Sequence, residues 1–289
     1  MKIGMIGLGA MGTHMARNLH RGGNLAGVWN RTSAKAQALA AELAVECFSS
    51  PADLARRCEV IVICVSADAD LRAVAQALLP AIQQGSLVID CSTVGAPTAR
   101  DLAAQFAAKQ SAFLDCPVSG GVEGARLGTL AIMAGGDAGA FERARPVLEL
   151  MGKTITHFGP SGSGQAAKAT NQIMCAGIIQ VVAEAMAFAK AEGLPLDALI
   201  ETLGKGAGSS WYFVNRAPFM ARGAYPAGFR VRLHDKDLRI CREMAAARGA
   251  TLPAVETTLS LYEQLIAQGF GDEDISAVFR LTPSLFHRD

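Results

Sequence analysis

The feature that most constrains the fold of this chain is a glycine-rich turn close to its first residue. Six residues, Gly7, Leu8, Gly9, Ala10, Met11 and Gly12, follow the apolar run Ile3 to Ile6 and form the pattern G-x-G-x-x-G. Helix-forming residues come next, and a second β-rich run ends at Trp29, so a strand, a helix and a strand fit within about thirty residues. This context predicts a Rossmann-type dinucleotide-binding unit.

The three glycines of the turn have different expected tasks. Gly7 permits a tight turn, Gly9 lets the backbone approach a pyrophosphate, and Gly12 allows the helix to pack closely on the strand. The first turn of the helix then offers free N–H groups to the anion. We therefore expect residues 7–12 to bind the diphosphate of a nicotinamide cofactor.

The end of the second strand lacks the acidic residue that normally binds a ribose 2′-hydroxyl. The chain reads Asn30, Arg31 and Thr32 at this point. A cationic Arg beside an amide and a hydroxyl offers donors to a 2′-phosphate. The pattern favours NADP (NADPH) as cofactor, with NAD bound at lower affinity. Alternatively, Thr32 or Ser33 is simply a helix N-cap that follows an incidental surface Arg.

Residues 1–160 alternate β-rich runs with stretches of helical length. This alternation predicts an α/β fold with a doubly wound, mostly parallel sheet and helices on both faces. We expect residues 1–160 to form the NADP-binding Rossmann domain. The expected strands are Lys2 to Ile6, Leu25 to Trp29, Val60 to Val65, Ser86 to Cys91, Ala112 to Cys116, Leu130 to Ala134 and Thr154 to Phe158.

The pattern becomes helical after a stretch rich in glycine and serine at residues 159–164. The segment Gln165 to Glu192 is nearly unbroken helix-forming sequence, long enough for roughly 40 Å of helix. We expect residues 161–289 to form an all-helical substrate and oligomerisation domain that begins with this long helix. Shorter helices are expected at Leu196 to Leu203, Asp235 to Ala247, Pro253 to Gln268 and Asp272 to Phe279.

The composition is that of a soluble globular protein. Of its 289 residues, 51% are apolar and 18% are charged. The length is enough for one large domain or two ordinary ones, with ample residues to form a core. The formal net charge is +1 and the basic residues are scattered, which argues against a nucleic-acid partner. The N-terminus has no apolar run of a signal peptide or membrane anchor, so we expect a cytoplasmic protein without a membrane partner.

Several other kinds of site lack their signatures. The seven cysteines are odd in number, widely spaced and mostly within apolar runs, so we expect buried thiols rather than disulfides. No C-x-x-C pair occurs and no His stands at ligand spacing from another His or Cys, so no metal site is expected. The segment Gly152-Lys153-Thr154 lacks the upstream glycine of a P-loop, and no G-x-S-x-G motif is present.

Five blocks in this sequence resemble the β-hydroxyacid dehydrogenase family, which includes 3-hydroxyisobutyrate dehydrogenase, tartronate semialdehyde reductase and the glyoxylate/succinic semialdehyde reductases. They are GLGAMGTHMARNL at 7–19, DCSTV at 90–94, DCPVSGG at 115–121, GSGQAAKATN at 162–171 and FRVRLHDKDL at 229–238. The resemblance runs nearly end to end, in the family's order. It implies an oxidoreductase that binds a nicotinamide cofactor.

Lys168 is the residue that the resemblance implies to be catalytic. A Lys on a helix is most often a solvated charge, but its neighbours Ala166, Ala167 and Ala169 are small, and apolar surroundings lower the pKa of a Lys toward the working pH. Such a Lys donates a proton to the carbonyl oxygen as hydride arrives, and takes it back in the oxidative direction.

Two amides follow Lys168 on the same helical face. Asn171 and Gln172 come three and four positions later. The resemblance implies that Asn171 orients the substrate and the lysine. The family commonly has a second Asn where this chain has Gln172, so the shape of the pocket is the point on which this sequence departs.

The remaining site residues combine residue chemistry with the resemblance. Ser119, Gly120 and Gly121 offer a hydroxyl and unhindered N–H groups to a substrate carboxylate, or else form an ordinary turn. The resemblance implies that Thr93 lies beside the nicotinamide and that Lys236 reaches the cofactor.

Other residues have more than one expected role. Val65 ends a strand beneath a ribose of the cofactor. Lys236 and Asp237 alternatively form a salt-bridged pair at a helix start. Asp237 and Phe229 are expected on the substrate side, where Phe229, Trp211 and Phe213 either wall the pocket or belong to the core.

These features together predict an NADPH-dependent reductase that converts small carboxylate-bearing aldehydes or keto acids to hydroxy acids. The expected substrates are glyoxylate, succinic semialdehyde and tartronate semialdehyde, with the proton supplied by Lys168. The alternatives are a 3-hydroxyisobutyrate-type dehydrogenase working oxidatively, an imine reductase, against which Lys168 argues, and a non-catalytic NADP-binding scaffold. The apolar long helix predicts a homodimer or homotetramer.

Overall fold

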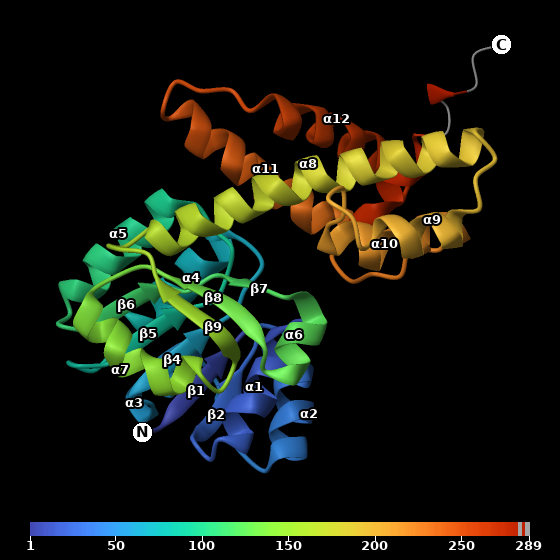
Figure 1. Ribbon diagram of the computed structural model, residues 1–289. Coiled ribbons are helices and arrows are strands. Elements are labelled where there is room, and N and C mark those ends of the chain that lie inside the picture. Colours follow the sequence, from blue (N-terminus) through green and yellow to red (C-terminus); the bar gives the residue numbers. More distant parts are fainter. Residues whose placement is uncertain (283–284, 287–289) are drawn as a thin grey trace. The chain divides into compact units, whose positions relative to one another are not determined.

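The computed structural model describes residues 1–282 and 285–286 and divides into two compact units. The N-terminal unit is Met1–Lys168 and the C-terminal unit is Ala169–Asp289. The helix α8 (Ser163–Ala191) begins in the first unit and continues into the second (Figure 1).

The N-terminal unit contains a six-stranded parallel sheet with the order β3-β2-β1-β4-β5-β6. This is the strand order of a Rossmann fold, so the α/β prediction is confirmed. The strands are β1 (Ile3–Ile6), β2 (Leu25–Trp29), β3 (Glu46–Cys47), β4 (Val60–Ile63), β5 (Leu87–Asp90) and β6 (Ala112–Asp115). The helices that alternate with them are α1 (Gly12–Arg21), α2 (Ser33–Leu43), α3 (Pro51–Arg57), α4 (Asp68–Leu78) and α5 (Ala96–Ala107).

Side chains of the central strands alternate between two cores. Val60 and Val62 of β4 point into one core, while Ile61 and Ile63 point into the other. The first core also holds residues of α1 and α2, and the second holds residues of α3, α4 and α5. Both faces of the sheet are therefore buried, which explains why the strands read as continuous apolar runs.

Two of the strands expected in the main sheet belong to a second one. In that three-stranded sheet, β7 (Val118–Ser119) pairs antiparallel with β8 (Leu130–Ala134), and β8 pairs parallel with β9 (Gly152–His157). The helices α6 (Gly121–Leu127) and α7 (Ala138–Leu148) connect these strands. The expectation of buried thiols fails at Cys47, which lies exposed in the short strand β3.

The C-terminal unit is helical. It packs the second part of α8 with α9 (Leu196–Leu203), α10 (Trp211–Arg222), α11 (Val231–Ala246), α12 (Pro253–Ala267) and the 3-10 helix η1 (Ile275–Arg280) (Figure 1). Apolar side chains such as Ile179, Leu259 and Val278 form a single core.

The helix predictions for this unit need three corrections. The helix α10 was not predicted, because Trp, Tyr and Phe open it and Pro218 lies inside it, so its propensity is low. The helix α11 begins at Val231 rather than Asp235. The segment expected as a helix at 272–279 is a short 3-10 helix, which Asp274 caps through the backbone N–H of Ser276.

Candidate active site

The glycine-rich turn has the geometry that the sequence predicts. Gly7 has φ +90°, and a Cβ on it would lie 2.2 Å from the carbonyl oxygen of Cys64. A Cβ on Gly12 would lie 1.9 Å from the carbonyl oxygen of Gly7, whereas one on Gly9 would meet nothing within 4 Å. Gly7 and Gly12 are therefore needed to form the turn itself, and Gly9 leaves its outer side open. The N-cap residue of α1, Met11, makes no side-chain capping bond, and within the first turn the N–H of Thr13 donates to the carbonyl oxygen of Gly9 (3.1 Å).

The segment after β2, residues 30–32, contacts the glycine-rich turn through Asn30 and forms an ion pair through Arg31. The side-chain oxygen of Asn30 accepts a hydrogen bond from the backbone N–H of Leu8 (2.9 Å), and its nitrogen donates to the carbonyl oxygen of Thr32 (3.0 Å). Arg31 is 82% exposed and pairs with Asp70 of α4 at 2.6 Å. Thr32 is the N-cap of α2 but its side chain makes no capping bond. Asn30 thus orders the turn, while Arg31 and the Thr32 hydroxyl are positioned toward solvent.

The carboxyl ends of four parallel strands bring several expected site residues together. Ile6, Ile63, Asp90 and Asp115 are in register across β1, β4, β5 and β6. Residues that follow these strands, including the glycine-rich turn, Val65 and Thr93, therefore meet at one edge, where ligands of doubly wound sheets bind.

A buried polar network holds these loops in the N-terminal unit. The Ser92 hydroxyl accepts from the backbone N–H of Val65 (2.9 Å). The Gln165 side chain donates to the carbonyl oxygen of Ser92 (2.9 Å) and accepts from the N–H of Val94 (3.2 Å). Gln165 lies one turn before Lys168 on α8, so the network links the loop of Thr93 to the start of that helix. Sequence reasoning missed this role for Gln165, although both Gln165 and Ser92 lie within the five family-like blocks.

Two buried carboxyl groups lie at the same edge. Asp115 accepts from the backbone N–H groups of Gly162 (2.8 Å) and Gln165 (2.9 Å) and so caps the start of α8. Burial raises the pKa of Asp115, and these N–H donors oppose the shift. Burial raises the pKa of Asp90 to about 7, despite its hydrogen bonds from Ser92. Among the residues that the structure describes, none gives the second oxygen of Asp90 a hydrogen bond.

The segment Ser119-Gly120-Gly121 joins β7 to α6. Gly120 and Gly121 both have positive φ, +127° and +63°, and both are exposed. A Cβ on Gly121 would meet nothing within 4 Å, and the N-cap residue of α6, Gly120, has no side chain that could form a capping bond. The hydroxyl of Ser119 and the first N–H groups of α6 therefore offer a neutral set of donors suited to a carboxylate.

Lys168 is buried, with 7% of its surface exposed, at the end of the N-terminal unit. Lysine side chains in folded proteins are rarely this buried. Lys168 comes three residues after Gln165, whose backbone N–H donates to Asp115 and whose side chain donates to Ser92. The helix α8 therefore starts at a fixed point and carries the expected catalytic lysine.

The C-terminal unit holds the other polar residues of the prediction. The Gln172 side chain donates to Asp237 (2.6 Å), and Asp237 pairs with Lys236 (2.9 Å). The nitrogen of Asn171 donates to the side-chain oxygen of Gln172 (2.7 Å). Lys236 and Asp237 thus do form the pair that the sequence left as an alternative, although within α11 rather than at its first residue.

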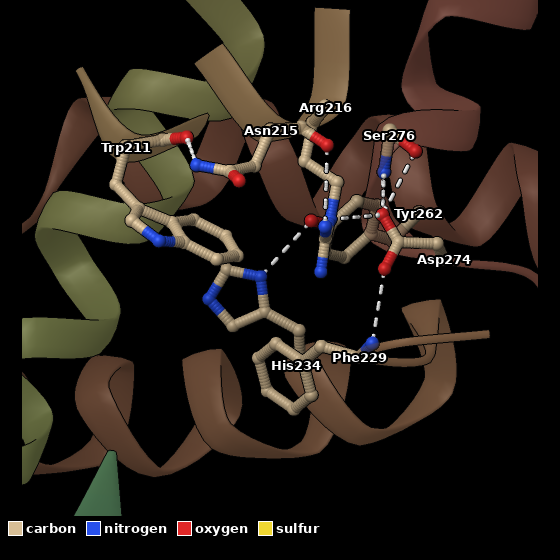
Figure 2. Close-up of polar contacts among 8 residues, drawn as sticks. All are labelled: Trp211, Asn215, Arg216, Phe229, His234, Tyr262, Asp274 and Ser276. Atoms are coloured by element: carbon tan, nitrogen blue, oxygen red, sulfur yellow. Dashed lines mark hydrogen bonds and ion pairs between the residues drawn. The ribbon is translucent and has the colours of Figure 1, made fainter. Parts of the chain in front are cut away.

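Phe229 is fixed by a carboxylate that sequence reasoning did not consider. Figure 2 shows Asp274 accepting hydrogen bonds from the backbone N–H of Phe229 (2.9 Å) and from Ser276, with Arg216 at 3.1 Å. Asp274 is fully buried, so this charge is paired where it lies. The backbone that leads into the FRVRLHDKDL block is therefore rigidly held.

His234 and the aromatic residues of this unit also have defined positions. One ring nitrogen of His234 contacts the Tyr262 hydroxyl (2.9 Å) (Figure 2). The other contacts the carbonyl oxygen of Gln172 (3.2 Å). Phe213 is buried in the core, which decides between the two roles that the sequence left open for it. Trp211 is 61% exposed and lies against the guanidinium of Arg216 (4.8 Å).

Comparison with known proteins decides which family these features represent. Residues 2–159 match the model of the NAD binding domain of 6-phosphogluconate dehydrogenase, and residues 162–282 match that of the NAD-binding domain of NADP-dependent 3-hydroxyisobutyrate dehydrogenase. The chain belongs to the β-hydroxyacid dehydrogenase family. As a member of this family it is an NAD(P)-dependent oxidoreductase that acts on CH–OH groups.

Relatives within the family differ in the reactions that their names give. The chain is 37% identical to the NAD-dependent L-serine dehydrogenase of Pseudomonas aeruginosa, over 97% of both proteins. It is 34% identical to the 2-hydroxy-3-oxopropionate reductase of Escherichia coli, over 96% of both. The structure of Mycobacterium tuberculosis 3-hydroxyisobutyrate dehydrogenase with L-serine superposes with a TM-score of 0.89, at 33% identity over 97% of this chain and 98% of that one.

Proposed function

We propose that this family member is an NADPH-dependent reductase of small carboxylate-bearing aldehydes or keto acids. Glyoxylate, succinic semialdehyde and tartronate semialdehyde are the proposed substrates, and hydroxy acids are the products. The cofactor supplies hydride when bound. Lys168 donates the proton to the carbonyl oxygen, and Ser119 with the N–H groups of Gly120 and Gly121 holds the carboxylate.

The observation that carries the reaction assignment is the buried Lys168, on a helix whose start is anchored by Asp115 and Gln165. A general acid must be held in place and shielded from water to act in a positioned transfer. A non-catalytic cofactor-binding protein has no need of a buried, unusually placed lysine. An imine reductase is likewise disfavoured by a lysine at this position.

The cofactor assignment is supported by the residues after β2. No carboxylate follows this strand, and Arg31 is exposed beside the hydroxyl of Thr32. A donor set of this kind suits a 2′-phosphate and does not repel it. Since cells usually keep NADP reduced, the same assignment favours reduction over the oxidative 3-hydroxyisobutyrate-type reaction.

The test is NADPH oxidation with glyoxylate, succinic semialdehyde, tartronate semialdehyde and methylmalonate semialdehyde. We expect turnover of at least one of the first three substrates. Lys168→Ala should turn it over slower by about a hundredfold or more, the order that general acid catalysis supplies. Lys190→Ala, an exposed lysine near the end of the same helix, is the matched control and should behave as wild type. NADPH binding without turnover of any substrate would contradict the proposal, and so would full activity in Lys168→Ala.

We further propose a cytoplasmic homodimer or homotetramer that associates through α8. By length and composition this helix resembles a membrane span, but half of its most apolar window is buried inside the protein. Met174, Val181 and Phe188 are seven residues apart and each is more than half exposed, so they form one apolar stripe. Sedimentation of a monomer at micromolar concentration would refute the association.

A further inference from the structure

Four polar side chains of the C-terminal unit form one continuous chain of contacts. Lys236 pairs with one oxygen of Asp237 (2.9 Å), and the Gln172 nitrogen donates to the other (2.6 Å). The Asn171 nitrogen in turn donates to the Gln172 oxygen (2.7 Å). Gln172 is 1% exposed and Asp237 is 4% exposed, so the centre of the chain is shielded from water.

The charge on Asp237 determines the direction of every hydrogen bond in this chain. An ionised carboxylate only accepts hydrogen bonds, so Gln172 must turn its NH₂ group toward Asp237. The Gln172 oxygen then faces Asn171, and Asn171 must turn its own NH₂ group inward. The Asn171 nitrogen also lies 3.4 Å from the Cys175 sulfur. These contacts occupy the donor side of the Asn171 amide, so its carbonyl oxygen is the group that it can offer to a ligand.

The length of Gln172 is what allows it to make both contacts. Its backbone carbonyl oxygen contacts a ring nitrogen of His234 (3.2 Å), which restrains this part of α8 relative to α11. An Asn at this position would be shorter by about one carbon–carbon bond, about 1.5 Å. The contact with Asp237 would then exceed hydrogen-bonding distance.

We propose that Gln172 is a positioning residue that fixes Asn171 as a hydrogen-bond acceptor for the substrate. Asn171 then accepts from a hydroxyl, which among the proposed ligands is the hydroxyl of tartronate semialdehyde or of a hydroxy-acid product, and it does not donate to a carbonyl oxygen. This inference rests on the proposed function. It also explains what the amide at position 172 does where the family commonly has Asn.

The test is the Gln172→Glu variant, which uses the fixed donor and acceptor directions of these hydrogen bonds. A protonated Glu donates to Asp237 and accepts from Asn171, as Gln172 does, whereas an ionised Glu places two carboxylates in contact. Burial and the charge of Asp237 should raise the pKa of the new Glu above its usual range near 4.3. The titratable groups around it are Asp237, Lys236 and His234 on α11, Tyr262 on α12 behind His234, and Cys175 and Lys168 on α8.

The expected result is a new pH dependence. The kcat/KM of Gln172→Glu, relative to wild type at the same pH, should be near one at pH 5 and fall at least tenfold by pH 8. The unfolding temperature relative to wild type should fall over the same range, because a raised folded-state pKa stabilises the fold at low pH and loses that effect as pH rises. Gln264→Glu, on an exposed position of α12, is the matched control and should show neither change.

Two further variants keep the inference testable if Gln172→Glu folds poorly. Gln172→Met keeps the length and removes both hydrogen bonds, and Gln172→Asn shortens the side chain. Both should lower kcat/KM about tenfold at every pH, with no rescue at pH 5. A wild-type-like pH profile of Gln172→Glu overturns the inference, as does a stability titration without an activity change, or full activity in Gln172→Met. Lack of turnover by the wild-type enzyme would instead overturn the proposed function.

Discussion

Replacing Arg31 with Ala should separate the two nicotinamide cofactors. In the free protein the guanidinium is 82% exposed and pairs with Asp70 at 2.6 Å. A 2′-phosphate that binds Arg31 must displace Asp70 or share the guanidinium with it. The effect of the substitution on NADPH binding is therefore the phosphate contact less the ion pair that binding disrupts.

Both contributions can be estimated. A hydrogen bond to a charged group contributes about 1.5–3 kcal/mol, and an exposed ion pair contributes up to about 1 kcal/mol. The difference of about 1–2 kcal/mol corresponds to roughly a tenfold weaker affinity of Arg31→Ala for NADPH. NADH lacks the phosphate, so its affinity should change little. Asp70→Asn should do the reverse and tighten NADPH binding by up to about fivefold, since no ion pair is lost.

The assay is calorimetric or fluorescence titration of NADPH and NADH against each variant. Arg56→Ala is the control, because Arg56 has a comparable exposed pair with Asp53 at 2.7 Å on α3. Equal weakening of both cofactors in Arg31→Ala would mean that Arg31 only supports the turn. Unchanged NADPH affinity would refute the phosphate contact altogether. An Asp70→Asn variant that binds NADPH more weakly would show that Asp70 helps to orient Arg31 and does not compete for it.

Two further predictions concern the N-terminal unit. Gly9→Ala should fold with an unchanged unfolding temperature yet bind NADPH at least tenfold more weakly, whereas Gly12→Ala should itself be destabilised, because its Cβ would lie 1.9 Å from the carbonyl oxygen of Gly7. Thermal unfolding with and without NADPH distinguishes them, and a destabilised Gly9→Ala would contradict this division. The pKa of Asp90, raised from 3.8 to about 7, means that burial of its ionised form costs up to about 4 kcal/mol. Stability is retained below pH 4 and falls as pH rises to 7, so Asp90→Asn should gain over wild type across this range in denaturant titrations, and a constant difference would argue against the shift.

Local sequence was enough to predict the strands that are buried on both faces of the main sheet. The strands β1, β2, β4, β5 and β6 are short apolar runs, and their parallel order follows from the alternation with helices. The separate sheet of β7, β8 and β9 was not predicted, since which strands pair depends on partners far along the chain. The helix α10 was also missed. Its local helix propensity is poor, and packing of Phe213, Ala217 and Met220 into a core stabilises it.

The site residues likewise include some that a local motif predicts and others whose role depends on distant contacts. A glycine whose φ is positive, such as Gly7 or Gly120, is recognisable from the motif around it, because the backbone alone demands it. A polar residue whose role depends on a partner far along the chain cannot be recognised from the sequence around it. Asp70 follows Arg31 by 39 residues, and the sequence gives no sign that the two side chains meet.

Gln172 shows why a departure from a family pattern is easy to notice and hard to interpret. The sequence shows that an amide is longer by one methylene, but the meaning of that methylene depends on Asp237, 65 residues away. It depends also on Lys236, since an ionised Asp237 is what prevents the Gln172 amide from turning over. A change at Lys236 is therefore expected to act on substrate orientation as well as on any contact with the cofactor. The two effects separate in kinetics, because the first alters discrimination between substrates with and without a donor group and the second alters the KM for the cofactor.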